Sequence, residues 1–213
     1  MKILNVVQGS NEWWDARKGR PTASEFKRFT TPSGKLSKAK TGDGLSQGAT
    51  TYASELLAEN FGWIKSEFSG SPDIERGLQL ENMARNFLAF EVGEKVKEVG
   101  ICISDCGRYA ASPDGMIIGG IPIELKCPDM HTQIRYLMNG GGIPSDYLAQ
   151  VHGQMVVTGA PFAWFCSYVA DARIPNILIR VERDTYTESL KGAVEEFCDR
   201  LEAIRQDLGK EAA

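Results

Sequence analysis

Residues 110–128 place three charged side chains in a segment that is otherwise mostly apolar or rich in glycine and proline, AASPDGMIIGGIPIELKCP. Short apolar runs separated by glycines are typical of strands joined by tight turns. Side chains alternate between the two faces of a strand, so Glu124 and Lys126 are expected to project to the same side. Asp114 ends the preceding strand, and the connection over 115–120 can fold it back beside Glu124. Two carboxylates and one ammonium group would then share a small site.

Such a site has a chemical use. Two carboxylates that lie close together repel each other, which raises one pKa unless a cation compensates. Lys126 offers one positive charge, whereas a hard divalent cation offers two and favours both carboxylates in their ionised form. Mg²⁺ binds through one or two carboxylates and leaves positions for water and substrate phosphate, which suits phosphodiester hydrolysis. The simpler alternative for a D-x9-E-x-K pattern alone is a partly exposed salt bridge on a hairpin.

The rest of the chain predicts helices around a central mixed β-sheet, which is an α/β (α+β) fold. The 213 residues suffice for one sizeable core and favour a single domain over residues 1–213. Thr22 followed by Glu25 resembles a capping box that opens a helix. Helices are also expected over 45–61, 73–91, 145–157 and 184–207, and strands over 96–103, 108–112, 121–127, 162–169 and 174–181.

The composition argues against several other classes of protein. No stretch approaches the roughly 18 apolar residues that a membrane-spanning helix needs, so no membrane partner is expected and a cytoplasmic location is predicted. The five cysteines are odd in number and form no CxxC pair, so neither a disulfide framework nor a zinc knuckle is indicated.

Charge is distributed unevenly along the chain. The formal net charge is -4, which by itself argues against a nucleic-acid partner. Residues 1–40, however, hold nine Lys and Arg against only three acidic residues. The N-terminal segment is therefore a candidate anion-binding surface on an otherwise acidic protein.

The motifs together resemble a known family of nucleases. D-(x)n-E-x-K on paired strands, with an acidic residue on an upstream helix and a glutamine on a following helix, resembles the PD-(D/E)XK nuclease superfamily. Within it, SPDG followed by ELKCP and then by YLAQVHGQM is similar to the phage lambda exonuclease family of alkaline exonucleases. The resemblance runs from about Trp13 to Val157. It implies a core like that of the restriction endonucleases.

The resemblance assigns roles to residues of the hairpin and of one helix. It implies that a metal is bound by Asp114, by Glu124 and by the backbone carbonyl of Leu125, with Lys126 as the catalytic lysine. Glu81, in LQLENMARNF, matches the family's helical glutamate, which approaches the same metal centre from the other side.

A second helix is expected to contribute a glutamine. Gln150 matches the glutamine of the family's AQ motif, a positioning group near the catalytic centre. Tyr147, Gln150 and Gln154 lie at i, i+3 and i+7, so one polar helix face can look into the site. His152 falls off that face, and we expect it to be a surface or packing histidine.

The N-terminal segment WWDARKGRPTASE resembles the family's W-(x)3-R-x-G...TASE segment. Its arginine and serine, with the serine of SPDG, form a pocket for a 5′-terminal phosphate in that family. The matching residues are Arg17, Ser24 and Ser112. A guanidinium group can bind phosphate through two hydrogen bonds, and Ser24 lies in the predicted first helical turn, where backbone N–H groups also attract anions. Arg20 departs from the family pattern, and it either adds a phosphate contact or is solvated.

The resemblance implies one nuclease domain with Mg²⁺-dependent 5′-to-3′ exonuclease activity. Such an enzyme degrades one strand of double-stranded DNA from its end to mononucleotides and leaves 3′ overhangs for homologous recombination by single-strand annealing. Two metal ions in each active site are implied, with Mn²⁺ as the alternative to Mg²⁺. The implied partners are double-stranded DNA ends, two further copies in a homotrimeric ring, and a single-strand annealing recombinase in the cytoplasm of a bacterial host.

Two other functions fit the same core. The chain could be a structure-specific or sequence-specific endonuclease, which would be indifferent to the chemistry of DNA ends. It could also be a catalytically silent scaffold that binds DNA ends for recombination. The presence of Asp114, Glu124 and Lys126 together argues against the scaffold, which has no need of the full set.

Overall fold

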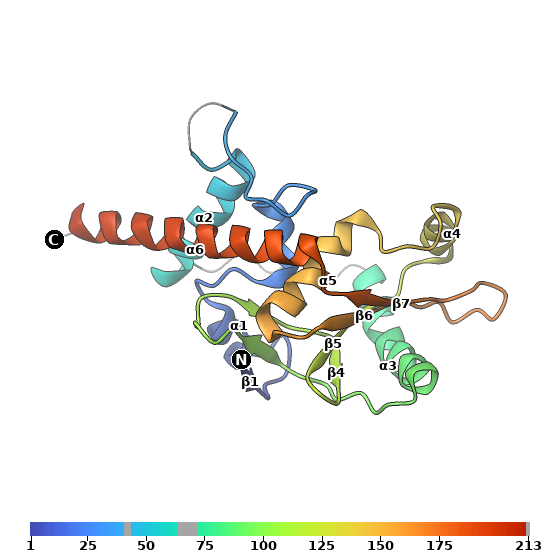
Figure 1. Ribbon diagram of the computed structural model, residues 1–213. Coiled ribbons are helices and arrows are strands. Elements are labelled where there is room, and N and C mark those ends of the chain that lie inside the picture. The colour runs from blue at the N-terminus through green and yellow to red at the C-terminus, as the bar shows by residue number, and fades with distance from the viewer. Residues whose placement is uncertain (41–43, 64–71, 212–213) are drawn as a thin grey trace.

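A computed structural model describes residues 1–40, 44–63 and 72–211 of the chain, with side chains for all of these except 72–79 and 210–211 (Figure 1). The helices are α1 (Asn11–Arg17), the 3-10 helix η1 (Ala23–Arg28), α2 (Gln47–Asn60), α3 (Pro72–Val92), α4 (Met130–Met138), α5 (Ser145–Thr158) and α6 (Thr185–Glu211). The strands are β1 (Lys2–Leu4), β2 (Ile101–Ile103), β3 (Ala110–Ala111), β4 (Gly115–Ile117), β5 (Ile121–Lys126), β6 (Phe162–Ser167) and β7 (Ile177–Glu182).

The strands form two sheets. One is antiparallel with the order β1-β2-β3, and the other has the order β4-β5-β6-β7, in which only β5 and β6 are parallel. A parallel pair needs a long crossover connection, and α4 and α5 form it between β5 and β6. The predicted mixed α+β class is confirmed, but the strands do not form one continuous sheet. Pro113, which has no backbone N–H to donate to a ladder, lies where the chain passes from the first sheet to the second.

Helices cover both faces of the second sheet. On one face, α3 packs through Ala84 and Leu88 against Ile123 and Leu125 of β5. On the other face, α5 packs Val151 and Met155 against Ala163 and Phe165 of β6. This arrangement leaves β5 between two helices, and the long α6 lies along the outer side of α5 (Figure 1). Residues 121–125 of β5 are therefore buried, and Lys126 at the end of the strand is partly exposed.

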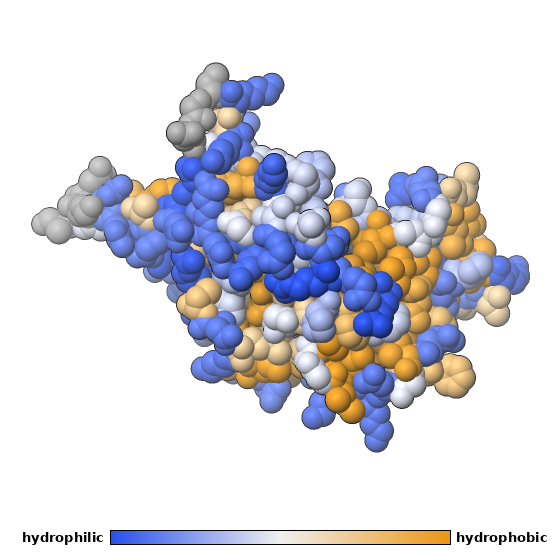
Figure 2. Space-filling model, viewed as in Figure 1, coloured by the Kyte–Doolittle hydropathy of each residue, from blue (hydrophilic) through white to orange (hydrophobic). Residues whose placement is uncertain are grey.

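The helix α5 also makes a close contact with η1. A Cβ atom built on Gly153 would lie 2.7 Å from a ring carbon of Phe26, so only glycine allows this approach without a shift. The contact fixes η1, and with it the residues before it, relative to the second sheet. Hydrophilic residues dominate the surface over α6, whereas hydrophobic residues gather over the strands of the second sheet (Figure 2).

Two predictions of local structure were wrong in detail. Thr22 is the N-cap of η1, but its side chain makes no capping hydrogen bond, so the capping box with Glu25 does not form. The predicted loop over 115–120 contains a strand, β4, and only its last residues form the turn. No helix within the described ranges is long and apolar enough to cross a membrane.

Candidate active site

The hairpin of β4 and β5 brings Asp114 to Glu124, as the sequence predicts. Gly115 pairs with Ile123 in an antiparallel register, which places Asp114 opposite Glu124. The Asp114 N–H donates to the carbonyl of Ile123 at 3.0 Å. Its carboxylate oxygen Oδ2 accepts a hydrogen bond of 2.6 Å from the backbone N–H of Leu125. The side chain of Asp114 is therefore held against the strand that carries the other two charges.

Glu124 is completely buried, and two side chains contact its carboxylate. Lys126 Nζ lies 2.5 Å from Oε1 in an ion pair, and the amide of Gln154 on α5 donates a hydrogen bond to Oε2. The ammonium group of Lys126 also lies 4.9 Å from the centre of the Tyr147 ring, which stabilises its charge. The predicted neighbourhood of Glu124 and Lys126 on one face of the strand is confirmed.

Burial and the mutual charges of these groups together shift their pKa values. Burial raises the pKa of Glu124 to about 7, with Lys126 opposing the rise and Asp114 adding to it. Burial also raises the pKa of Asp114, again against the effect of Lys126. Burial alone would lower the pKa of Lys126, but the charges of Glu124 and Asp114 outweigh it and raise that pKa. Lys126 is thus a stable cation at neutral pH, beside carboxylates that need further positive charge to ionise fully.

Glu81 approaches this group from α3, on the side opposite to α5. Its Oε1 accepts a hydrogen bond of 2.6 Å from Arg85 Nη2, and the same guanidinium group donates to the backbone carbonyl of Asp114. Burial raises the pKa of Glu81, and the charge of Asp114 raises it further. Glu81 therefore lies within electrostatic reach of Asp114. Arg85, which the sequence analysis did not single out, joins the two.

The oxygen-rich set fits a hard divalent cation. Apart from the ion pair with Lys126, the buried Oε1 of Glu124 has no hydrogen-bond partner among the described residues, so this oxygen keeps a lone pair for a further ligand. Within the described ranges no three His, Cys, Asp or Glu side chains are arranged as a metal site by themselves. A metal at this position would need the backbone carbonyl of Leu125 in addition to Asp114 and Glu124. Carboxylate and carbonyl oxygens are the ligands that Mg²⁺ and Mn²⁺ prefer.

The glutamine in contact with the site is Gln154, one turn beyond Gln150. Gln154 is buried and bonds to Glu124, whereas Gln150 is only half-buried on the same helix. The positioning role assigned to Gln150 stays a prediction. His152 packs away from Glu124, where its Nδ1 lies 2.7 Å from Thr187 Oγ1. Burial lowers the pKa of His152, as expected for a packing histidine.

A second polar cluster lies around Ser112, two residues before Asp114. Ser112 Oγ accepts hydrogen bonds from Trp13 Nε1 at 2.8 Å and from Arg17 Nη1 at 3.5 Å. Arg17 Nη2 donates to Thr22 Oγ1 at 3.0 Å, and Thr22 Oγ1 lies 3.5 Å from Ser24 Oγ. The guanidinium carbon of Arg17 lies 4.2 Å from the centre of the Trp13 ring. The three residues proposed for a phosphate pocket are thus brought together, although 95 positions separate Arg17 from Ser112.

Two neighbours of this cluster differ from expectation. Thr22, expected to cap a helix, accepts from Arg17 instead and joins the cluster. Arg20 donates to the backbone carbonyls of Ala16 and Gly107, both at 2.9 Å, and so ties α1 to the turn between β2 and β3. Its predicted phosphate contact stays untested.

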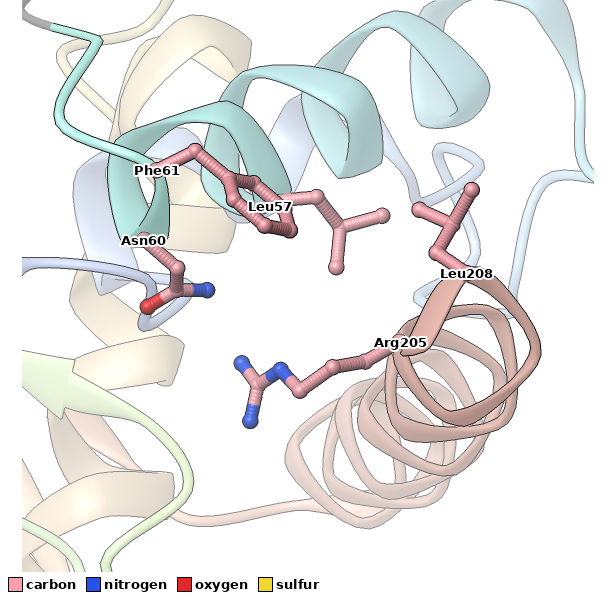
Figure 3. Close-up of a pocket in the computed structure, with 5 residues that line it drawn as sticks. All are labelled: Leu57, Asn60, Phe61, Arg205 and Leu208. Atoms are coloured by element: carbon pink, nitrogen blue, oxygen red, sulfur yellow. The ribbon is translucent and has the colours of Figure 1, made fainter. Parts of the chain in front are cut away.

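A separate hollow of about 320 Å³ lies between the C-terminal ends of α2 and α6 (Figure 3). It is lined by Leu57, Asn60, Phe61, Arg205 and Leu208. None of these residues belongs to the acidic hairpin or to the cluster around Ser112, so the hollow is distinct from the candidate active site.

Comparison with known proteins agrees with this geometry. Residues 12–161 match the family of YqaJ-like viral recombinase domains. The alkaline exonuclease LHK-Exo from Laribacter hongkongensis is 30% identical, with a TM-score of 0.76 over 95% of this chain and 98% of that chain. The structure of LHK-Exo in complex with dAMP has the same identity and coverage and a TM-score of 0.77.

A more distant structure shares the fold alone. The phage-related exonuclease from Haemophilus somnus is 14% identical, with a TM-score of 0.59 over 86% of this chain and 95% of that chain. A search of curated proteins found no match. The family match covers more than half of the chain, including both clusters. The chain therefore belongs to the family of YqaJ-like viral recombinase domains.

Proposed function

We propose that the chain is a metal-dependent exonuclease that degrades one strand of duplex DNA in the 5′-to-3′ direction. The observation that carries the proposal is the position of Ser112 and Asp114, which join an arginine-serine cluster to a buried acidic site. One solved relative at 30% identity, LHK-Exo, is an alkaline exonuclease, and one of its two structures is a complex with dAMP. Family membership and the oxygen-rich site agree with phosphodiester hydrolysis.

The metal would be held by Asp114, Glu124 and the carbonyl of Leu125, with Glu81 on the opposite side. When bound, a divalent ion supplies Lewis-acid stabilisation of the negative charge that develops on the phosphate. We propose Mg²⁺, with Mn²⁺ as the alternative and two ions in each active site. The buried Glu124 supports this assignment, because its ionisation is incomplete near neutral pH without more positive charge.

Lys126 and Gln154 have distinct roles in this proposal. The ammonium group of Lys126 remains charged, so it acts by stabilising negative charge on the phosphoryl group rather than by accepting a proton. Gln154 donates to Glu124 and holds its carboxylate in a single orientation. An oriented carboxylate loses less entropy on binding a cation than a free one.

Arg17, Ser24 and Ser112 would bind the 5′-terminal phosphate. Burial lowers the pKa of Arg17, with the nearby Tyr52 and Glu25 opposing the shift. A phosphate in the cluster would return negative charge to this guanidinium group and accept from the hydroxyl groups around it. Arg20 contributes at the edge of the same N-terminal segment.

The wider assembly follows the family resemblance. We propose one nuclease domain over residues 1–213 and a homotrimeric ring that encloses DNA. A ring explains how a chain of net charge -4 stays on a polyanion, because enclosure replaces part of the electrostatic attraction. A single-strand annealing recombinase that uses the 3′ overhang and a cytoplasmic location in a bacterial host complete the proposal.

End chemistry separates the exonuclease from an endonuclease. Linear duplex with 5′-phosphate or 5′-hydroxyl ends is digested in Mg²⁺, and the products are sized. Mononucleotides released faster from phosphorylated ends support the proposal. Internal cuts in closed circular DNA refute it in favour of an endonuclease, and binding of ends without any hydrolysis refutes it in favour of a scaffold.

A further inference from the structure

Arg85 has a fully occupied guanidinium group at the edge of the acidic site. Its side chain is only 11% exposed, and its nitrogens make five hydrogen bonds. Nη2 donates to Glu81 at 2.6 Å, and Nη1 donates to Asn82 at 2.6 Å and to Glu98 at 2.9 Å. Nε and Nη2 both donate to the backbone carbonyl of Asp114, at 3.3 Å and 3.2 Å. One side chain thus joins α3, the segment before β2 and the start of β4.

These contacts need the shape of arginine. Its planar fork presents five N–H donors in fixed directions, whereas the three donors of lysine share one nitrogen. Gly115, the residue after Asp114, packs tightly on its other neighbour: a Cβ atom there would lie 2.5 Å from Val96, whereas its 3.9 Å distance from Arg85 Nε is an ordinary contact. The bonds to the Asp114 carbonyl hold the backbone from which that carboxylate extends.

A purely electrostatic role and a positioning role predict different results. A positive charge beside Asp114 and Glu81 opposes the binding of a cation, so removing it would strengthen metal binding if charge were all that mattered. If Arg85 holds the two carboxylates in place, its loss weakens both metal binding and catalysis despite the relief of repulsion. Replacement by lysine separates the two, since lysine keeps the charge and loses the fork.

We propose that Arg85 is a positioning residue that holds Glu81 and the Asp114 backbone in the geometry required for metal binding and DNA hydrolysis. The inference rests on the proposed metal-dependent nuclease function. Arg85 acts through Glu81 and Asp114 and does not itself contact the reacting atoms.

The test compares Arg85→Lys and Arg85→Gln with a matched control, Arg183→Gln. Arg183 also bridges a carboxylate and a backbone carbonyl, those of Glu188 and Met155, but outside the acidic hairpin. Mg²⁺ binding is measured by calorimetry with MgCl₂ alone, and single-turnover cleavage is measured on 5′-phosphorylated duplex. Circular dichroism and thermal denaturation report folding. Arg85→Lys decides the question if Arg85→Gln does not fold, because lysine leaves no acidic group without a cation.

We expect Arg85→Lys to slow cleavage at least tenfold, since a displacement of about 1 Å in a catalytic group can cost about a hundredfold. We also expect Mg²⁺ binding to weaken at least threefold, with Arg183→Gln close to the parent in both measurements. Combining Arg85→Lys with Glu81→Gln should cost less than the sum of the two single replacements, because part of the effect of Arg85 passes through Glu81 and the rest through Asp114.

Three results would overturn the inference. The first is an Arg85→Lys variant that equals the parent in cleavage rate and in Mg²⁺ binding, because that equality means that only the charge at this position matters. The second is tighter Mg²⁺ binding by Arg85→Gln at an unchanged cleavage rate, which would also mean that Arg85 acts only through its charge. The third is full additivity of the effects of Arg85→Lys and Glu81→Gln on cleavage, because independent effects would mean that Arg85 does not act through Glu81. If the parent binds Mg²⁺ but cleaves no DNA, the proposed function fails, and calorimetry on the same variants still decides the role of Arg85.

Discussion

Replacing Gln154 by leucine tests the hydrogen bond to Glu124 directly. Leucine has a similar volume, so the main change is loss of the amide that donates to the buried carboxylate. A hydrogen bond to a charged group contributes about 1.5–3 kcal/mol. The hydrogen bond from Gln154 therefore stabilises Glu124 mainly in its ionised form, which is the form that binds a cation. At about 1.4 kcal/mol for each factor of ten, Mg²⁺ binding should weaken about tenfold to a hundredfold. Calorimetry with MgCl₂ and the Mg²⁺ dependence of cleavage measure the shift.

Gln133 offers a matched control for this experiment. It is also completely buried, and its amide donates to the carbonyls of Ser167 and Pro175 rather than to Glu124. Gln133→Leu should lower the free energy of unfolding but leave the Mg²⁺ dependence of cleavage unchanged. The reasoning is refuted if Gln154→Leu keeps the parent's Mg²⁺ dependence, or if Gln150→Leu shifts that dependence further than Gln154→Leu does.

Three further predictions concern the phosphate cluster, pH and packing. Arg17→Ala should remove the preference for 5′-phosphorylated over 5′-hydroxyl duplex ends, measured as the ratio of initial rates, and an unchanged ratio contradicts the pocket. Burial lowers the pKa of His152 in the folded state, so the neutral histidine contributes fully to stability above pH 6.5, its ordinary pKa. This contribution is lost as the pH falls from 6.5 through the lower pKa of the folded state. The free energies of urea unfolding of the parent and of His152→Gln should therefore differ most above pH 6.5 and converge at lower pH. Gly153→Ala should destabilise the protein by about 1–3 kcal/mol in urea unfolding, because the added carbon overlaps Phe26, and a neutral result would mean that η1 can shift without cost.

The hairpin could be predicted because it depends on local rules. Strand alternation places Glu124 beside Lys126 whatever the rest of the fold does, and a short glycine-rich connection leaves Asp114 few places to go. The same local logic predicted the long helices α2, α3, α5 and α6, whose apolar periodicity extends over several turns. These elements bring Asp114, Glu124 and Lys126 together, so the proximity of these three side chains was predictable with them.

Contacts between distant segments were less predictable. The spacing of Gln150 and Gln154 places both on one helix face, but the translation of α5 along β5 decides which of them meets Glu124. That translation depends on the crossover through α4, which the sequence analysis did not identify as a helix. Thr22 was similarly predicted to be a helix cap from local sequence alone. Its hydroxyl oxygen instead accepts a hydrogen bond from Arg17, five residues earlier. Arg85 had an available signal, since it follows Glu81 by four residues on a helix.

The position of Ser112 connects the two clusters to the proposed products. Ser112 and Asp114 are two residues apart, so their Cα atoms are separated by at most about 7 Å. The rigid ring of Pro113 between them limits how far that separation can vary. A strand of duplex DNA advances about 3.4 Å for each nucleotide along the helix axis, so a terminal phosphate held at Ser112 leaves only the first few phosphates within reach of Asp114. If the proposed phosphate pocket at Ser112 is correct, the short covalent link confines cleavage to the first few nucleotides of the strand, and the size of the products tests this spacing.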